Sequence, residues 1–194
     1  GNFVTRVKSD RGITEIKHGA IVIATGAEVY KPTEYLYGED DRVMTHLELE
    51  EKIAEGDDNV LGAKSLVMIQ CVGCRNEERN YCSRICCSEA IKNCLVLKER
   101  NPEMDIYVLF RDMRTYGFKE DYYRKASEKD VKFIRYEPQD KPVVEPGVSE
   151  DGRSILKVTV ADSILGKKLE LDADIISLAA AVIPSSHRKD LVGL

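Results

Sequence analysis

The stretch that decides the fold is KSLVMIQCVGC, residues 64–74. Its centre holds a run of consecutive apolar residues, which is typical of a strand buried on both faces of a sheet. Cys71 follows this run almost at once, and parallel sheets place their ligands at the carboxyl ends of their strands. We therefore expect a buried strand that carries a functional cysteine at its end.

Helix and strand patterns alternate after this strand. Helical spacing of apolar residues covers 88–100 and a polar helix is expected over 119–128, while strand-like runs occupy 105–110 and 131–136. This order predicts an α/β fold with a parallel, Rossmann-like sheet. Three more elements are expected farther out: a helix to about residue 54 that starts at a capping box, an antiparallel hairpin, and another buried strand. The capping box consists of Thr45 and Glu48. The hairpin pairs 155–160 with 168–171 around Gly166, and the buried strand covers 174–181.

The first 45 residues show a different, strand-rich pattern. Apolar and polar residues alternate over 3–7 and 13–16, which predicts a hairpin. The β-branched run at 20–24 predicts a strand buried on both faces. We therefore expect a strand-rich segment over 1–45 and a three-layer Rossmann-like domain over 46–194. The second domain contains the cysteine segment (64–100) and a β-hairpin (150–172).

Composition excludes several classes of protein. The chain has 194 residues, 43% of them hydrophobic and 32% charged, which suits a packed domain or one domain with part of another. The formal net charge of -5 argues against nucleic-acid binding, which needs clustered Lys and Arg. No apolar run approaches the roughly 20 residues that span a bilayer. No signal peptide is visible, so we expect a cytoplasmic protein.

The cysteines carry the strongest chemical signal. Six are present, and five of them lie between positions 71 and 87 in the spacing C-x2-C-x7-C-x3-C-C. Such clustering without a secretion signal favours metal or redox chemistry over disulfide stapling. A four-iron cluster needs four thiolates. Cys82 and Cys86 are four apart, so we expect them to share a helical face, and nearby arginines favour thiolates. These arginines are Arg75, Arg79 and Arg84.

Three alternatives stay open for this segment. In the first, the thiols are buried and free or form disulfides. In the second, four of them bind zinc, but the adjacent pair Cys86 and Cys87 fits the usual spacing of zinc ligands poorly. In the third, Cys71 and Cys74 form a redox-active CxxC dithiol. Cys94 lies on the expected apolar helix face, so we interpret it as a core residue.

Other groups of residues give weaker indications of a functional site. The glycine-rich turn that binds a pyrophosphate is missing after the strand, since cysteines stand there instead. Arg111, Asp112 and Arg114 follow the next strand, where they either face a phosphate or a partner or form a solvated loop with local ion pairs, and we favour the loop. His18, His46 and His187 are interpreted as surface or loop residues without metal-ligand spacing.

Four blocks of sequence resemble the A subunit of heterodisulfide reductases. They are MIQCVG at 68–73, RNYCSRICC at 79–87, AIK at 90–92 and LFRDMRTYGF at 109–118. The resemblance covers residues 20–140 well and the rest loosely. It implies a thioredoxin-reductase-like core that binds FAD and carries an additional [4Fe–4S] cluster. The implied ligands are Cys71, Cys82, Cys86 and Cys87, with Cys74, often Ser in this family, as a possible substitute.

The resemblance also implies a function. Members of this family are oxidoreductases that act on sulfur groups and pass electrons between flavin, iron–sulfur clusters and partner subunits. Expected partners are other subunits of such a complex and electron donors such as hydrogenase or ferredoxin. The turn formed by Ala24, Thr25, Gly26 and Ala27 is expected beside the flavin, at the end of a strand of an FAD-binding domain. We expect the rest of that domain outside residues 1–194 and the fragment alone to be inactive.

Overall fold

The computed structural model describes residues 1–186, which form two compact units. The larger unit comprises residues 29–182. The smaller one comprises residues 1–28 and the segment that starts at Ile183. The expected division into domains at residue 45 stays a prediction.

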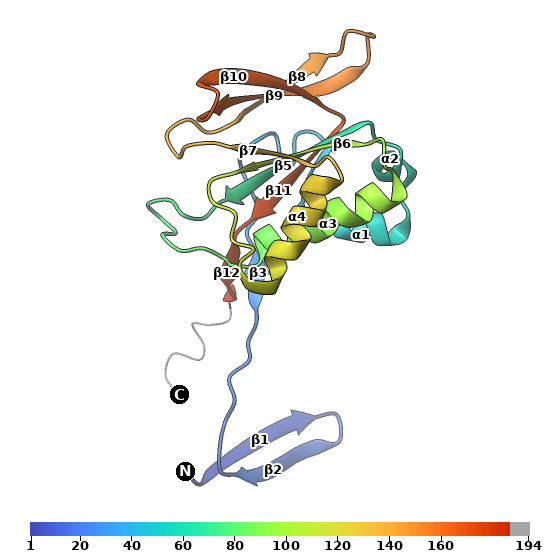
Figure 1. Ribbon diagram of the computed structural model, residues 1–194. Coiled ribbons are helices and arrows are strands. Elements are labelled where there is room, and N and C mark those ends of the chain that lie inside the picture. Colours follow the sequence, from blue (N-terminus) through green and yellow to red (C-terminus); the bar gives the residue numbers. More distant parts are fainter. Residues whose placement is uncertain (187–194) are drawn as a thin grey trace. The chain divides into compact units, whose positions relative to one another are not determined.

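A parallel sheet forms the centre of the larger unit (Figure 1). Its five strands lie in the order β4-β11-β5-β6-β7, and every neighbouring pair is parallel. The apolar run that precedes Cys71 belongs to β5, the middle strand. The predicted α/β fold with a Rossmann-like sheet is confirmed. The strands are β4 (Val43–Thr45), β5 (Ser65–Val72), β6 (Asp105–Phe110), β7 (Lys132–Arg135) and β11 (Ile175–Ala180).

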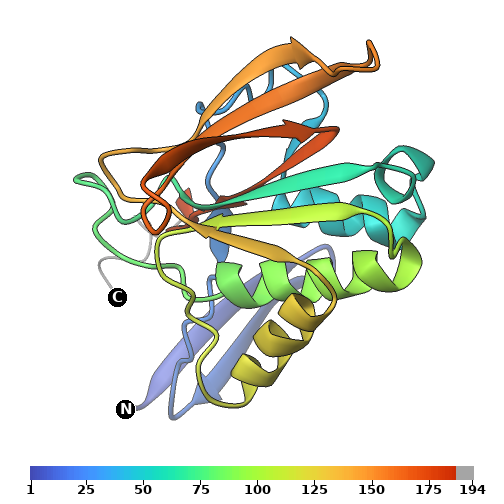
Figure 2. The same ribbon diagram turned by 45° about the horizontal axis from the view of Figure 1, so that its top comes forward.

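Helices cover one face of this sheet, and a second sheet covers the other face (Figure 2). The main helices are α1, α3 and α4, and α3 contacts both of the others as well as β5 and β11. None of the helices within residues 1–186 combines the length and apolar composition that a membrane crossing requires. The helices are α1 (His46–Glu55), α2 (Asp58–Leu61), α3 (Cys86–Arg100), the 3-10 turn η1 (Gly117–Lys119) and α4 (Glu120–Glu128).

The side chains of β5 alternate between two hydrophobic cores. Leu66 and Met68 pack in the core beneath the helices. Val67 and Ile69 pack in the core beneath the second sheet. All four are essentially inaccessible to solvent. Burial on both faces explains why this strand is a continuous apolar run and not an alternating one.

The second sheet is antiparallel, in the order β10-β9-β8. It confirms the predicted hairpin, which turns at Gly166 with φ +62°. The third strand was not predicted because Pro146 interrupts its pattern. Proline is tolerated here because β8 is an edge strand. The strands are β8 (Val143–Val148), β9 (Ser154–Asp162) and β10 (Lys167–Ala173).

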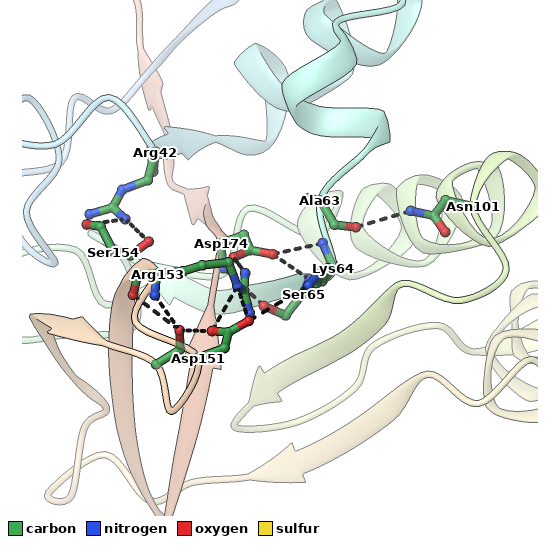
Figure 3. A network of polar contacts seen from close by, with 10 residues as sticks. Arg42, Ala63, Lys64, Ser65, Asn101, Asp151, Arg153, Ser154 and Asp174 are labelled. Carbon is green, nitrogen blue, oxygen red and sulfur yellow. Dashed lines mark hydrogen bonds and ion pairs between the residues drawn. The ribbon is translucent and has the colours of Figure 1, made fainter.

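A polar network ties the start of β9 to the start of β5 (Figure 3). Oδ2 of Asp174 accepts hydrogen bonds from the main-chain nitrogens of Lys64 at 2.8 Å and Ser65 at 3.2 Å. Oδ1 of the same carboxylate accepts one from Nη1 of Arg153 at 2.8 Å. Because Asp174 directly precedes β11, the network fixes how this strand enters the sheet beside β5.

The capping box at the start of α1 is confirmed. Oγ1 of Thr45 accepts from the main-chain nitrogen of Glu48, and the Glu48 carboxylate accepts from the nitrogen of Thr45 at 2.6 Å. Such reciprocal bonds satisfy the free N–H groups at a helix start. The helix ends at Gly56, whose φ of +77° is the left-handed conformation of a C-cap.

The smaller unit contains the predicted N-terminal hairpin of β1 (Phe3–Ser9) and β2 (Gly12–His18). The prediction of a buried strand over 20–24 is wrong: residues 20–26 have no regular structure, and Val22 is 88% exposed. An apolar run supplies strand propensity, but burial requires neighbouring strands, and none pairs with this segment within residues 1–186. β3 (Ala27–Val29) follows and pairs with β12 (Val182–Pro184).

Candidate metal centre

The carboxyl end of β5 turns sharply. Cys71, Gly73 and Arg75 all have left-handed backbones, with φ of +64°, +74° and +55°. At Gly73 a Cβ atom would lie 2.2 Å from the ring of Tyr30, so any side chain there would have to displace that ring. This backbone brings Cys71 and Cys74 to one end of the sheet, as the position of the strand predicts.

The segment between β5 and α3 has no regular structure but is held by hydrogen bonds. The nitrogen of Arg75 donates to the carbonyl of Tyr81 at 3.1 Å, and the hydroxyl of Tyr81 donates to the carbonyl of Val182 at 3.1 Å. The Ser83 hydroxyl accepts from the nitrogen of Val182 at 2.9 Å. Cys82 lies within this anchored loop, where its sulfur accepts from the nitrogen of Arg84 at 3.3 Å.

The expectation that Cys82 and Cys86 share a helical face is wrong. α3 begins at Cys86, and Cys82 lies outside it. The physical reason is Arg84, whose φ of +67° is incompatible with a right-handed helix at that position. The helix also begins two residues before the predicted residue 88, so the two adjacent cysteines form its first turn.

Both cysteines of that first turn are buried against other elements. The thiol of Cys86 donates to the carbonyl of Ala180 at 3.8 Å, and the thiol of Cys87 donates to the carbonyl of Asp112 at 3.7 Å. The N-cap residue Ile85 makes no capping hydrogen bond from its side chain. Free N–H groups and the positive end of the helix dipole therefore face this region, and both favour negatively charged groups.

The structure brings the four predicted ligands into one neighbourhood. Cys71 comes from β5, Cys82 from the loop, and Cys86 and Cys87 from α3. Burial is the main cause that raises the pKa of Cys86 to about 12, and it also raises the pKa of Cys87. Negative charge on Cys71 or Cys82 contributes in the same direction for both thiols, which shows that these sulfurs are electrostatic neighbours.

Cys71 and Cys74 influence each other's ionisation. A hydrogen bond from Cys74 is the main cause that lowers the pKa of Cys71 to about 6, and the nearby guanidinium of Arg75 lowers it further. The same hydrogen bond raises the pKa of Cys74. Cys71 is thus the thiol that ionises first, with Cys74 as its protonated neighbour.

Charged residues surround Cys71. Nη1 of Arg75 lies 3.9 Å from the Cys71 sulfur, and Nη2 of Arg75 pairs with Asp112 at 2.6 Å. Nη1 of Arg111 donates to the carbonyl of Arg75 at 2.9 Å. The predicted ion pairs of the loop after β6 are confirmed, since Asp112 also lies 3.9 Å from Arg114. A cavity of about 370 Å³ opens beside both Cys71 and Cys74, with Arg75 and Arg111 in its lining.

The donor set has the number and type of ligands that a four-iron cluster needs. Within residues 1–186, no three His, Cys, Asp or Glu side chains converge on a single ion position. The ligand sulfurs of a four-iron cluster stand farther apart, because each binds a different iron. Four thiols from three segments, an uncapped helix start and an adjacent arginine fit such a cluster in chemistry.

Cys94 is a core residue, as predicted. It is fully buried, and its thiol contacts the Met68 sulfur at 3.7 Å. His18 is a strand residue that stacks on Phe3. The interpretation of His46 as a surface or loop residue is wrong, because it is 2% exposed and binds Ser177 and Gln70. Its partners are far away in the sequence, so no local signal identifies it. His187 lies outside the described residues.

The predicted flavin contacts lie in the smaller unit. Ala24, Thr25 and Gly26 belong to the irregular exposed segment, and Ala27 begins β3. Gly26 has φ +68°, and a Cβ atom there would meet no atom within 4 Å. The main chain is therefore open on this side, and a flavin contact at these four residues stays a prediction.

No family model matches the chain. It is 34% identical over 224 residues to the A subunit of the ferredoxin:CoB-CoM heterodisulfide reductase of Methanosarcina acetivorans, covering 94% of this chain and 27% of that protein. It is 37% identical over 193 residues to the A subunit of the H(2):CoB-CoM heterodisulfide,ferredoxin reductase of Methanothermobacter marburgensis, covering 91% and 28%. The predicted resemblance is confirmed, and the chain spans little more than a quarter of these relatives.

The similarity of this chain to solved structures concerns the fold alone. The L-lysine 6-monooxygenase of Pseudomonas syringae superposes with a TM-score of 0.52 at 11% identity, over 95% of this chain and 51% of that one. The ornithine N-hydroxylase of Kutzneria sp. 744, with reduced FAD and NADP+, gives 0.50 at 13% identity, over 98% and 52%. Both agree with the Rossmann-like architecture.

Proposed function

We propose that this chain, which matches one segment of the A subunits of heterodisulfide reductases, is the part of an electron-transfer subunit that holds a [4Fe–4S] cluster at the end of β5. One observation carries the proposal: thiols from β5, from the following loop and from the first turn of α3 lie close enough for the charge of one to raise the pKa of another. The proposed ligands are Cys71, Cys82, Cys86 and Cys87. When bound, such a cluster accepts and donates single electrons.

The surroundings of the four thiols suit this role. Cys86 and Cys87 are buried and have raised pKa values, so metal binding to them would be coupled to the release of their protons. The uncapped start of α3 and the Arg75 guanidinium stabilise the negative charge that four thiolates bring. The hydrogen bonds of the loop hold Cys82 near the others before any metal arrives.

In the complete protein we infer an oxidoreductase of the cytoplasm that acts on sulfur groups and passes electrons between FAD and clusters. The names of the relatives support this inference, because they are reductases of a heterodisulfide and both names include ferredoxin. Ala24, Thr25, Gly26 and Ala27 are the proposed flavin contacts. Other subunits of the complex, and donors such as hydrogenase or ferredoxin, are the proposed partners.

A second candidate function is a flavin-dependent reductase that uses Cys71 and Cys74 as a dithiol. The feature that favours it is the closeness of the two thiols, since interaction with Cys74 is the main cause that lowers the pKa of Cys71 to about 6. A thiolate at neutral pH is the form that attacks disulfides. The cavity beside both residues gives a small disulfide access to them. The third, a zinc-stabilised interaction module, has no comparable observation.

Anaerobic reconstitution with iron and sulfide separates these candidates. The cluster proposal predicts about four irons and four sulfides per chain, together with the broad visible absorption of iron–sulfide charge transfer. Absence of iron uptake, with two thiols that cycle to a disulfide, would favour the dithiol reductase. One zinc per chain, retained through purification and not displaced by iron, would favour the structural module.

A further inference from the structure

We propose that Arg75, held in place by Asp112, sets the reduction potential of the cluster by donating a hydrogen bond to the sulfur of Cys71. This inference rests on the proposed function. Arg75 is a positioning residue in this account, since it acts on the cluster through the sulfur of a ligand and is not itself a ligand.

The first observation is the placement of the guanidinium. Nη1 of Arg75 lies 3.9 Å from the Cys71 sulfur, within the range of a hydrogen bond to sulfur. The side chain of Arg75 is only 19% exposed, so water screens its charge weakly. The left-handed backbone of Arg75, φ +55°, is unfavourable for a side chain of this size. Such a backbone conformation persists only where surrounding contacts hold the residue, and Arg75 has these contacts.

The second observation is that the loop after β6 contacts both the guanidinium and the main-chain carbonyl of Arg75. Oδ2 of Asp112 accepts from Nη2 at 2.6 Å, which aims the guanidinium. Arg111 donates to the carbonyl of Arg75 at 2.9 Å, which fixes the main chain. The carbonyl of Asp112 also accepts from the thiol of Cys87 at 3.7 Å. One loop therefore positions Arg75 and contacts a second proposed ligand.

The sign of the effect follows from charge. A cluster held by four thiolates would carry negative charge, and its reduction would add one more electron. A positive group and a hydrogen bond at a ligand sulfur stabilise the reduced form more than the oxidised form. Arg75 therefore raises the reduction potential, and its removal lowers it.

The test is an EPR-monitored redox titration of the anaerobically reconstituted chain. We expect Arg75→Gln to shift the midpoint potential to more negative values, and Arg75→Lys to shift it less, because lysine keeps the charge but lacks the forked guanidinium that contacts both Cys71 and Asp112. Arg84→Gln is the matched control. It removes the same charge from the same segment, but Arg84 is exposed and its side chain makes no hydrogen bond or ion pair in the described part of the chain. Its shift should be clearly smaller.

Asp112 is tested by a double-mutant cycle. If Asp112 holds Arg75, then Arg75→Gln should shift the potential less in an Asp112→Asn background than in the wild type. An unchanged potential in Arg75→Gln, or an equal shift in Arg84→Gln, would overturn the proposal. If Arg75→Gln lost its iron, the potential of Arg75→Lys would decide in the same way. The iron content of the wild type separates failure of the proposed function from failure of this inference. A wild type that does not bind four irons contradicts the proposed function, whereas a wild type that binds them but keeps its potential in Arg75→Gln contradicts only the role of Arg75.

Discussion

The imidazole of His46 and the hydroxyl of Ser177, 131 positions apart in the sequence, lie 2.6 Å apart in the buried core. On the other side of the ring, Nε2 lies 3.0 Å from the amide nitrogen of Gln70, the residue before Cys71. With the amide nitrogen of Gln70 donating to Nε2, the ring proton lies on Nδ1, which donates to the Ser177 hydroxyl. This contact links α1 and β11 to the strand that ends at the candidate site.

Acidification should destabilise the fold through His46. Burial, helped by Lys92, lowers the pKa of His46 to about 3, whereas the unfolded ring titrates near its ordinary value of 6.5. Between these values the unfolded chain binds a proton that the folded chain does not. The free energy of unfolding should therefore fall by up to about 1.4 kcal/mol per pH unit as the pH drops below 6.5.

Urea unfolding of the reduced, metal-free chain between pH 7.5 and pH 4.5 measures this slope. Carboxylates also titrate in part of this range, so the comparison is with His46→Gln, which keeps a neutral polar group of similar size. The slope of the variant should be smaller than that of the wild type. Equal slopes would show that His46 does not carry the effect.

Gly73→Ala should cost far more stability than Gly117→Ala. Both glycines have left-handed backbones, with φ of +74° and +67°, and this conformation alone costs a side chain about 1–2 kcal/mol. A Cβ atom at Gly73 would also collide with the ring of Tyr30, on which the Arg79 guanidinium packs at 4.6 Å. At Gly117 it would meet nothing within 4 Å. Denaturant unfolding of both variants compares the two costs, and similar values would contradict the close packing at Gly73.

Replacement of a proposed ligand should abolish cluster binding. Cys82→Ser and Cys86→Ser should each fail to retain four irons after reconstitution, because the hydroxyl of serine is a poor substitute for a thiolate. Cys94→Ser is the matched control: it should keep its iron and lose about 1–3 kcal/mol of stability, the cost of burying a hydroxyl in an apolar core. Iron analysis and unfolding of the same samples separate the two effects. Loss of the chromophore in Cys94→Ser would refute the ligand assignment.

Cys74→Ser tests whether Cys74 is a ligand of the cluster or only lies beside it. The cluster account with Cys71, Cys82, Cys86 and Cys87 predicts that this variant binds as much iron as the wild type. The dithiol account predicts instead that the variant loses disulfide reduction, because Cys74 would be the thiol that resolves the mixed disulfide. Iron content and a disulfide-reduction assay on one preparation give both answers. A variant without iron would place Cys74 among the ligands.

Local patterns predicted the parts of the fold that depend on local physics. The apolar run of β5 and the capping box of Thr45 and Glu48 are short signals with short-range causes, and both are confirmed. The run at 20–24 has the same pattern as β5 but is exposed, because burial depends on strands supplied from elsewhere. Local spacing cannot distinguish the two.

The candidate site shows the same limit. The cysteine spacing marked the segment, but the left-handed turns at Cys71 and Arg75 decide which side chains meet there. The contact between Arg75 and Asp112 spans 37 positions and has no sequence signature. The start of α3 lies at Cys86 because Arg84 has a left-handed backbone, which no propensity of arginine predicts. Contacts over long separations are set by tertiary packing and not by local preference.

The most direct test of the proposed cluster is a crystal structure of the anaerobically reconstituted chain, with anomalous diffraction collected at the iron edge. We expect four irons in one cluster at the carboxyl end of β5, each bonded to one sulfur of Cys71, Cys82, Cys86 or Cys87. A structure of the reconstituted chain without iron at this place, or with a disulfide between Cys71 and Cys74, would contradict it.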